Sequence, residues 1–413
     1  MGCRPRAPCW FVVPLPCDLE LPLRIIGLWI GSDCALRSVC DDRSNLQVSS
    51  FTIRNVKTWD AIVVGGGIIG LSLSIALRKR GLKVLLVEKG KPGREASYAA
   101  AGMIADGGDE FPPAMHALAK ASAKMYPEFV HELQDESGTK IDLRDEGTLL
   151  LHHSGRKFSD ALPVQLAELD PGVINPGLDV CYLKERSVDP RGLVAAALKA
   201  AKHREVDISS GTAVTEMSFI GKRINGVQTE RTFYGAPIVV NCAGAWAGSI
   251  GPHKLPTRPV KGQIIAVVGA PVLRHVLRTP GIYLVPRSDG RIVIGATIED
   301  VGFDKRTDPD TVQRLRRSAV ELVPELAKAK TIEAWAGLRP GTPDNLPILG
   351  GTTTQGYFVA TGHFRDGILL APVTAALMAE LIVDGESRYD VSGFSSERFA
   401  DQQTKELEVW KAI

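Results

Sequence analysis

The chain has 413 residues, 44% of them hydrophobic, and its 49 basic and 47 acidic residues give a formal net charge of +2. This length predicts two or three domains with sizeable cores. Because no long block of like charges occurs, the composition does not support a nucleic-acid partner or an anionic membrane surface, and we expect a small-molecule ligand.

The cysteines and histidines indicate neither a disulfide framework nor a metal site. Only Cys181 and Cys242 lie beyond the first forty residues, and no CxxC motif occurs. This usage favours a reducing, cytoplasmic location. His152 and His153 are adjacent in a predicted strand, where their side chains would point to opposite faces, so we expect no metal ion there.

Residues 1–56 differ in composition from the rest of the chain. Their most apolar stretch, residues 25–31, is far shorter than the ~18 to 20 apolar residues that a membrane span needs. The charges before this stretch are mixed, and no clear cleavage site follows it, which argues against a signal peptide. We expect residues 1–56 to be a disordered or non-native extension, and we expect no membrane span.

The first strongly patterned stretch is residues 60–88, DAIVVGGGIIGLSLSIALRKRGLKVLLVE. It predicts a buried strand at residues 61–64, a helix at residues 69–80 and a second buried strand at residues 83–88. This strand, helix and strand form the opening unit of a Rossmann fold.

Three glycines between the first strand and the helix, Gly65, Gly67 and Gly70, form a GxGxxG motif. They allow a tight turn, close approach of a pyrophosphate, and close packing of helix on strand. Glu88 follows 18 residues after Gly70, near the place where a carboxylate binds ribose hydroxyls. The unit predicts a dinucleotide site but does not distinguish FAD from NAD. Residues 89–108, rich in small side chains, are expected to form a wall of that site, with a flexible loop as the alternative.

The middle of the chain predicts alternating helices and strands. Helices are expected at residues 113–133, with a kink at Pro127, and at residues 191–202 and 311–323. Strands are expected at residues 147–152, 207–217, 227–232, 236–244, 264–268, 281–286 and 291–296, with turns at Gly221 and at Asn225-Gly226. Antiparallel strands inserted after a βαβ unit indicate α+β additions to a Rossmann core.

The last patterned part begins with a loop rich in glycine and proline that contains Arg339. A buried strand at residues 357–361 and an apolar helix at residues 368–383 follow, and the helix N-terminus can face an anion. An arginine can hold a carboxylate through two parallel charge-assisted hydrogen bonds. The alternatives are that Arg339 pairs with Asp344, and Arg365 with the adjacent Asp366.

Eight motifs and the acidic residue Glu88 occur in the order typical of one protein family; the motifs are GGGIIG, ASYAAAGM, VDPRGL, VVNCAGAWAG, RPVKGQ, YLVPRSDGRIVIGAT, WAGLRPGTPDNLPILG and GHFRDGILLAP. In these motifs the chain resembles the D-amino-acid oxidase family of FAD-dependent oxidoreductases, and within it the bacterial glycine oxidases of thiamine biosynthesis. The resemblance covers about residues 59–385. It implies a Rossmann-type FAD-binding domain of α/β class with an interleaved α+β substrate domain built on an antiparallel sheet.

The resemblance also implies domain boundaries. Residues 57–110, 190–250 and 335–385 would form the FAD-binding domain, residues 111–189 and 251–334 the substrate domain, and residues 386–413 a C-terminal tail.

The resemblance assigns site residues by position. The pyrophosphate and ribose of FAD would contact Gly65, Gly67, Ile68, Ile69, Gly70, Glu88 and Lys89. The rest of FAD would contact Ala96, Ser97, Ala101, Gly102, Met103 and Val214, the last beside the adenine. The flavin ring would contact His363, Phe364, Asp366, Gly367, Ile368 and Leu369. Arg339 would bind the substrate carboxylate, helped by Arg365 and Tyr283.

The function implied is oxidation of glycine, with sarcosine and small D-amino acids as further substrates, to the imino acid and glyoxylate. Molecular oxygen would be reduced to hydrogen peroxide, and the product would supply thiamine thiazole synthesis. Two alternatives stay open: a dehydrogenase that passes electrons to a quinone or other carrier, and a flavin-binding module without catalysis. The sequence allows a homo-oligomer without specifying one. Family members can carry a histidine at the position of Gly281, and glycine there leaves more room for substrate.

Overall fold

The computed structural model describes residues 58–107, 112–155, 158, 160–269 and 273–400. The contacts divide the chain into two units, Met1–Val56 and Lys57–Ile413, and the expected extension at residues 1–56 lies outside the described residues. Within the described ranges, no helix is both long enough and apolar enough to cross a bilayer.

A six-stranded sheet with the order β19-β20-β13-β1-β2-β9 forms the first half of the fold. Its strands are β1 (Ala61–Val64), β2 (Val84–Glu88), β9 (Asp207–Ser210), β13 (Ile238–Asn241), β19 (Ile348–Gly351) and β20 (Tyr357–Thr361). All neighbours pair in parallel except β19 and β20, which are antiparallel. The carboxyl ends of the parallel strands therefore meet at one edge, where ligands of Rossmann folds bind.

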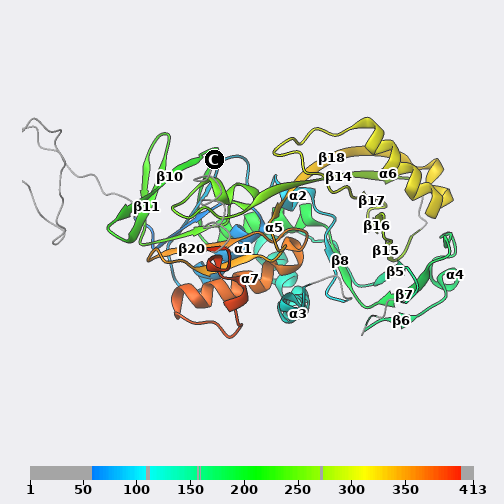
Figure 1. Cartoon of the computed structure of the whole chain (residues 1–413), viewed down its shortest axis with the longest axis horizontal. Coiled ribbons are helices and arrows are strands. Elements are labelled where there is room, and N and C mark those ends of the chain that lie inside the picture. The colour runs from blue at the N-terminus through cyan, green and yellow to red at the C-terminus, as the bar shows by residue number, and fades with distance from the viewer. Residues whose placement is uncertain (1–57, 108–111, 156–157, 159, 270–272, 401–413) are drawn as a thin grey trace, which may run out of the picture. The chain divides into compact units, whose positions relative to one another are not determined.

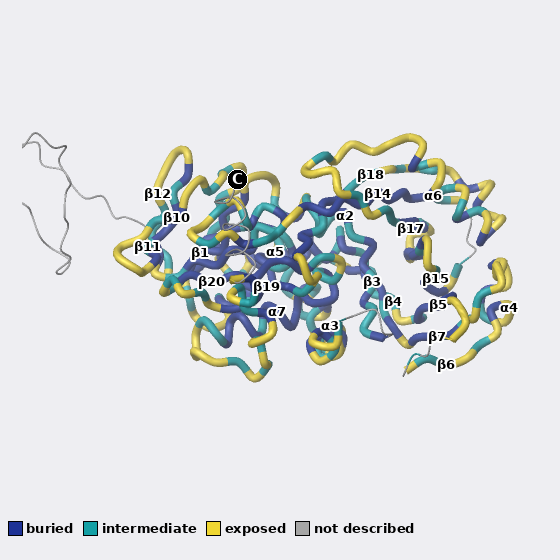
Figure 2. Tube along the Cα trace, viewed as in Figure 1, coloured by how far each residue is buried: buried dark blue, intermediate teal, exposed yellow. Residues whose placement is uncertain are grey.

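Alternate residues of β1 face two different layers. Ala61 and Val63 share a buried cluster with helices that cover one face of the sheet: α1 (Ile68–Lys79), α3 (Pro113–Ser137), α5 (Pro190–His203) and α7 (Gly367–Val383). Ile62 and Val64 belong to a second cluster, shared with a small antiparallel sheet on the other face. Because side chains alternate along a strand, a fully apolar run such as AIVV suits this sandwiched position. Figure 2 shows β1 as buried.

The small sheet corrects two predictions. It consists of β10 (Val214–Ile220), β11 (Arg223–Thr229) and β12 (Phe233–Gly235). The single strand expected at residues 207–217 is instead two strands in different sheets, β9 and β10, separated by Gly211 with φ +69°. The turn expected at Asn225-Gly226 lies inside β11, because the chain already reverses at Gly221, where φ is +61°.

An eight-stranded sheet with the order β18-β14-β17-β16-β15-β5-β7-β6 forms the second half of the fold. Its strands are β5 (Thr148–His152), β6 (Leu162–Pro163), β7 (Asp179–Leu183), β14 (Arg258–Val268), β15 (Val276–Arg278), β16 (Tyr283–Pro286), β17 (Ile292–Gly295) and β18 (Lys330–Gly341). Its pairs are antiparallel except β5 with β15. The mixture of a parallel-type sheet and a largely antiparallel one confirms the predicted fold class.

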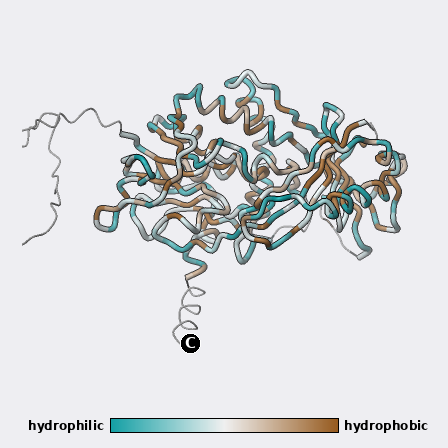
Figure 3. The backbone as a smooth tube through the Cα atoms, turned by 90° about the horizontal axis from the view of Figure 1, so that it is seen from above, coloured by the Kyte–Doolittle hydropathy of each residue, from teal (hydrophilic) through white to brown (hydrophobic). Residues whose placement is uncertain are grey.

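The two faces of this sheet have different neighbours. Ile265 and Val267 of β14 share a buried cluster with Leu315 and Ala319 of α6 (Pro309–Leu322), which covers one face. Ile264 belongs to a cluster on the opposite face, which lines the site described below. Figure 3 shows hydrophobic stretches interspersed with hydrophilic ones along the backbone.

Strand β18 is the main element that the sequence did not predict. The Gly/Pro-rich segment around Arg339 was expected to be a loop, but it pairs with β14 along the length of β18. Pro340 is compatible with this strand because β18 is at the sheet edge, where one side of the backbone needs no hydrogen-bond donor.

Short elements complete the fold. A third small sheet consists of β3 (Met103–Ile104), β8 (Arg186–Val188) and β4 (Leu143–Arg144). The remaining helical turns are α2 (Ala96–Ala99), α4 (Leu166–Leu169), η1 (Gly244–Ser249), η2 (Pro324–Lys328), η3 (Ser392–Phe394) and η4 (Ser396–Phe399). The predicted division into two discontinuous domains and a tail stays a prediction.

Candidate functional site

A cavity of about 730 Å³ lies between the carboxyl ends of the parallel strands and the inner face of the eight-stranded sheet. This volume is within the range of small-molecule and cofactor sites. Among the residues predicted from the sequence, the cavity is lined by Gly65, Gly67, Ile68, Ile69, Glu88, Lys89, Ala96, Ser97, Ala101, Gly102, Met103, Val214, Tyr283, Arg339, His363, Phe364, Arg365, Asp366, Gly367 and Ile368. Gly70 and Leu369 do not line it.

The glycine turn after β1 brings backbone close to the cavity. Gly65 has φ +108°, and a side chain there would collide with the carbonyl oxygen of Cys242. Gly70 lies in the first turn of α1, where a Cβ would collide with the Gly65 carbonyl oxygen. Gly70 packs the helix against the turn and does not line the cavity, and its assignment as a cofactor contact stays a prediction. The Ile68 amide, expected at the pyrophosphate, donates to the Ser97 hydroxyl at 3.0 Å.

Glu88, at the end of β2, is a buried carboxylate with one backbone donor on each oxygen. Oε2 accepts from the Gly66 amide at 2.7 Å, and Oε1 accepts from the Gly90 amide at 2.8 Å. An ionised carboxylate has about four acceptor positions. The two left over can accept the hydroxyls of a ribose, and these backbone bonds fix the orientation of the carboxylate.

The rim near Glu88 includes residues that the sequence reasoning did not select. The Lys89 ammonium lies 3.3 Å from the centroid of the Trp246 ring, and burial lowers the pKa of Lys89. Trp246 in turn stacks on Phe303, with ring centroids 5.2 Å apart. Lys305 pairs with Glu95 at 3.0 Å, so the segment after β17 also reaches this rim.

The segment between β20 and α7 forms the opposite wall. Phe364 adopts φ +45°, a backbone conformation that is uncommon for residues other than glycine. Its amide donates to the Pro340 carbonyl at 3.0 Å. His363 is buried and lies 3.1 Å from the Thr374 hydroxyl, and burial lowers its pKa to about 3. The first turn of α7 presents Ile368 to the cavity and Leu369 to the helices behind, and the assignment of Leu369 as a flavin contact stays a prediction.

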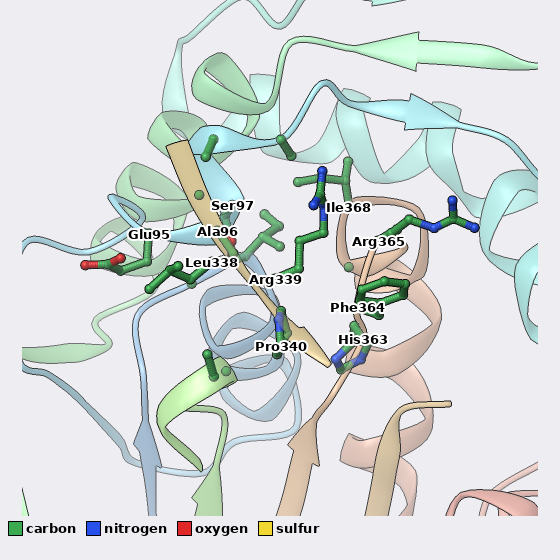
Figure 4. Close-up of a pocket in the computed structure, with 18 of the residues that line it drawn as sticks. Glu95, Ala96, Ser97, Leu338, Arg339, Pro340, His363, Phe364, Arg365 and Ile368 are labelled. Carbon is green, nitrogen blue, oxygen red and sulfur yellow. Dashed lines mark hydrogen bonds between the residues drawn. The ribbon is translucent and has the colours of Figure 1, made fainter. Parts of the chain in front are cut away.

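Arg339 extends from β18 into the cavity (Figure 4). Its Nη1 atom donates to the backbone oxygens of Thr297 at 3.0 Å and of Lys261 at 3.4 Å. Among the described residues, no carboxylate pairs with it, and the alternative partner Asp344 instead accepts from Arg398 at 2.8 Å. Burial lowers the pKa of Arg339, because removal of water destabilises the charged guanidinium.

Tyr283 and Arg365 lie near this guanidinium. Burial raises the pKa of Tyr283, while the hydrogen bond and charge of Arg339 lower it. Arg365 is exposed, with its guanidinium 5.6 Å from the centroid of the Phe364 ring, and Figure 4 shows it directed away from Arg339. The helping role predicted for Arg365 stays a prediction.

Other residues that line the cavity and were missed include Gly262, Arg278 and Gly295. The motifs RPVKGQ and RIVIGAT contained the two glycines, but only the strand register shows which residues face the cavity. Arg278 forms a buried ion pair with Glu185 at 2.9 Å and lies on β15, a three-residue strand that gave no periodic signal.

The site fits a dinucleotide in three respects: a glycine turn with no room for a side chain, the N-terminus of α1 beside it, and a buried carboxylate with acceptor positions left. Residues 60–381 match the family described as FAD dependent oxidoreductase. The chain belongs to this family. The match confirms the predicted family and the FAD cofactor, and it resolves the ambiguity between FAD and NAD.

Curated relatives extend this result. The chain is 34% identical over 358 residues to glycine oxidase of Pseudomonas aeruginosa, covering 81% of this chain and 97% of the relative. It is 31% identical over 405 residues to hydrogen cyanide synthase subunit HcnC of the same organism, covering 83% and 97%. It is 37% identical over 367 residues to bifunctional protein ThiO/ThiG of Trichormus variabilis, covering 84% of this chain but only 56% of that relative's length.

Among solved structures, glycine oxidase of Geobacillus kaustophilus resembles the chain with a TM-score of 0.77 and 31% sequence identity, covering 82% of this chain and 98% of the other. L-proline dehydrogenase of P. horikoshii, at 22% identity and a TM-score of 0.76, shares the fold.

Proposed function

We propose that this FAD-dependent oxidoreductase oxidises the carbon–nitrogen bond of small amino acids, with glycine first and sarcosine and small D-amino acids as further substrates. With glycine the products would be the imino acid, which water converts to glyoxylate and ammonia, and hydrogen peroxide from molecular oxygen. The relatives named glycine oxidase and bifunctional protein ThiO/ThiG support this proposal and a use of the product in thiamine thiazole synthesis.

The observation that carries the proposal is the position of Arg339. A guanidinium in the cavity, with a pKa lowered by burial and no carboxylate partner among the described residues, calls for an anionic ligand. A substrate carboxylate meets that need through a bidentate pair, which fixes the position of the α-carbon as well as the charge. Nε and Nη2 suit this pair, because Nη1 already donates to two backbone oxygens.

The other side chains assist binding and orientation. FAD, when bound, supplies the acceptor for the two electrons that leave the substrate. Tyr283, which burial keeps protonated, can donate a hydrogen bond to the substrate. His363 stays neutral and bonded to Thr374, so it is not assigned as an acid or base at the α-carbon. Catalysis would then rest on orientation and on the positive end of α7, which favours negative charge at its N-terminus.

Anaerobic mixing with glycine, sarcosine, D-alanine and D-proline tests the proposal, with loss of flavin absorbance as the signal. We expect at least one amino acid to bleach the wild type. We also expect Arg339→Lys to lower kcat/KM by about tenfold or more for every substrate, because an ammonium cannot form the bidentate pair. A wild type that no amino acid bleaches, or an Arg339→Lys variant with unchanged kinetics, would contradict the proposal.

A second candidate is favoured by the relative named hydrogen cyanide synthase subunit HcnC, whose length the chain covers almost completely. In that case glycine would lose four electrons and four protons to give hydrogen cyanide and carbon dioxide, and the electrons would leave through another carrier. Glycine turnover with an artificial electron acceptor, assayed for cyanide, glyoxylate and peroxide, distinguishes the two. Cyanide without peroxide would favour the second candidate.

A further inference from the structure

Gly262 lies directly beneath the guanidinium of Arg339. In the register of β14 with β18, Gly262 is opposite Gly337 and Arg339 is opposite Val260. Arg339 is therefore the diagonal neighbour of Gly262 on the face that lines the cavity, within reach of a long side chain. Both residues line the cavity.

The space that Gly262 leaves is filled by the arginine. A Cβ atom at position 262 would lie 2.5 Å from Cζ of Arg339 and closer still to both terminal nitrogens. Ordinary contacts of a Cβ atom begin at 3.4 Å. A methyl group at this position would therefore displace the guanidinium by about 1 Å, since carbon atoms prefer to be ~3.5 to 4.0 Å apart.

From this geometry we infer that Gly262 is a positioning residue for the substrate carboxylate, an inference that rests on the proposed function. The absent side chain creates the slot in which the guanidinium lies against the backbone of β14. The bonds from Nη1 to the Lys261 and Thr297 oxygens then fix its rotation within the slot. Arg339 supplies the charge, and Gly262 determines where that charge is held.

The requirement for glycine here concerns this contact and not the backbone. Gly262 does not adopt a left-handed φ, and it lies within the extended strand β14. Alanine can therefore keep the same backbone. The group that must move is the far end of a flexible side chain, so we expect the fold to tolerate the change.

The test compares Gly262→Ala with Gly351→Ala as the matched control. Gly351 also lies in a strand, β19, without a left-handed φ, and a Cβ there would meet only the Phe358 ring at 3.6 Å, an ordinary contact. For each variant, flavin content, thermal midpoint, kcat/KM for glycine and the dissociation constant of acetate would be measured, acetate being a carboxylate without an amine.

We expect Gly262→Ala to weaken acetate binding and to lower kcat/KM by about tenfold to a hundredfold, because a shift of about 1 Å in an orienting group has effects of this size. Flavin content should match that of Gly351→Ala. If Gly262→Ala binds acetate and oxidises glycine like the wild type, the inference is overturned while the proposed function stands. If the wild type itself oxidises no amino acid, it is the proposed function that fails.

A double-mutant cycle separates positioning from a general structural effect. In an Arg339→Ala background, where no guanidinium occupies the slot, Gly262→Ala should cause no further loss of acetate binding. An equal loss in both backgrounds would overturn the inference. Should Gly262→Ala alone fail to fold, a folded double variant would trace the clash to Arg339, and an unfolded one would refute that cause.

Discussion

Replacing Glu88 with glutamine tests how the site would hold the adenosine end of FAD. Each carboxylate oxygen of Glu88 accepts one backbone amide, from Gly66 at 2.7 Å and Gly90 at 2.8 Å. A glutamine retains one acceptor oxygen and presents an amide donor to the other N–H group. One of the two backbone donors, both near a buried side chain, therefore loses its partner.

The cost can be worked from these contacts. A hydrogen bond to a charged group contributes about 1.5 to 3 kcal/mol, and a buried donor left without a partner costs a similar amount. Part of this cost would appear as lower stability of the glycine turn and part as weaker cofactor binding. If about half reaches the binding equilibrium, FAD affinity falls by about tenfold, since about 1.4 kcal/mol corresponds to a factor of ten.

The assay is reconstitution of the apoprotein with FAD, followed by flavin fluorescence, with FMN as the comparison ligand. FMN lacks the adenosine ribose, so its binding should be affected less than that of FAD. Equal losses for FAD and FMN would show that the substitution acts through general destabilisation, and unchanged FAD affinity would refute the assignment of Glu88 to the ribose.

Two further predictions concern the substrate end of the cavity. Gly281→His should lower kcat/KM for sarcosine and D-alanine more than for glycine. A Cβ at position 281 has no atom within 4 Å, so the imidazole would fill space that larger substrates need. An equal effect on all three substrates would contradict this prediction. Acetate binding should stay constant between pH 8 and about 10, where an exposed tyrosine is half ionised, because burial raises the pKa of Tyr283 and keeps its hydroxyl a donor. A progressive loss of binding over this interval that Tyr283→Phe abolishes would show that Tyr283 ionises there.

Local patterns predicted the nucleotide-binding half of the fold. The buried run Ala61–Val64, the glycines after it and the strand that ends at Glu88 lie within one short segment, and their side-chain types alone specify strand, turn and helix. The structure extends the expected helix at residues 113–133 to Ser137, where Gly138 adopts φ +61° and ends it. The order of the predicted strands and helices, together with the family resemblance, indicated the class of fold, because the two kinds of sheet have different hydrophobic patterns.

Pairing between distant segments was not predictable in the same way. Strand β18 contains glycine and proline, and it is a strand because β14, about seventy residues earlier, supplies its hydrogen bonds. The same pairing places Arg339 over Gly262, a relation that no local pattern contains. For a related reason the motifs did not show that Gly70 and Leu369 lie outside the cavity lining, since membership of a motif does not tell whether a residue faces the cavity or the core behind it.

The cavity wall has a consequence for how the protein responds to its ligand. The cavity wall is formed by segments between Val64 and Ile368, so a molecule that fills the cavity contacts both large sheets at once. Such a ligand binds the native chain and not the unfolded one, and by mass action it raises the melting temperature by an amount that grows with the logarithm of its concentration. The absorbance of bound flavin in a preparation would then be proportional to the number of molecules in which both halves have folded.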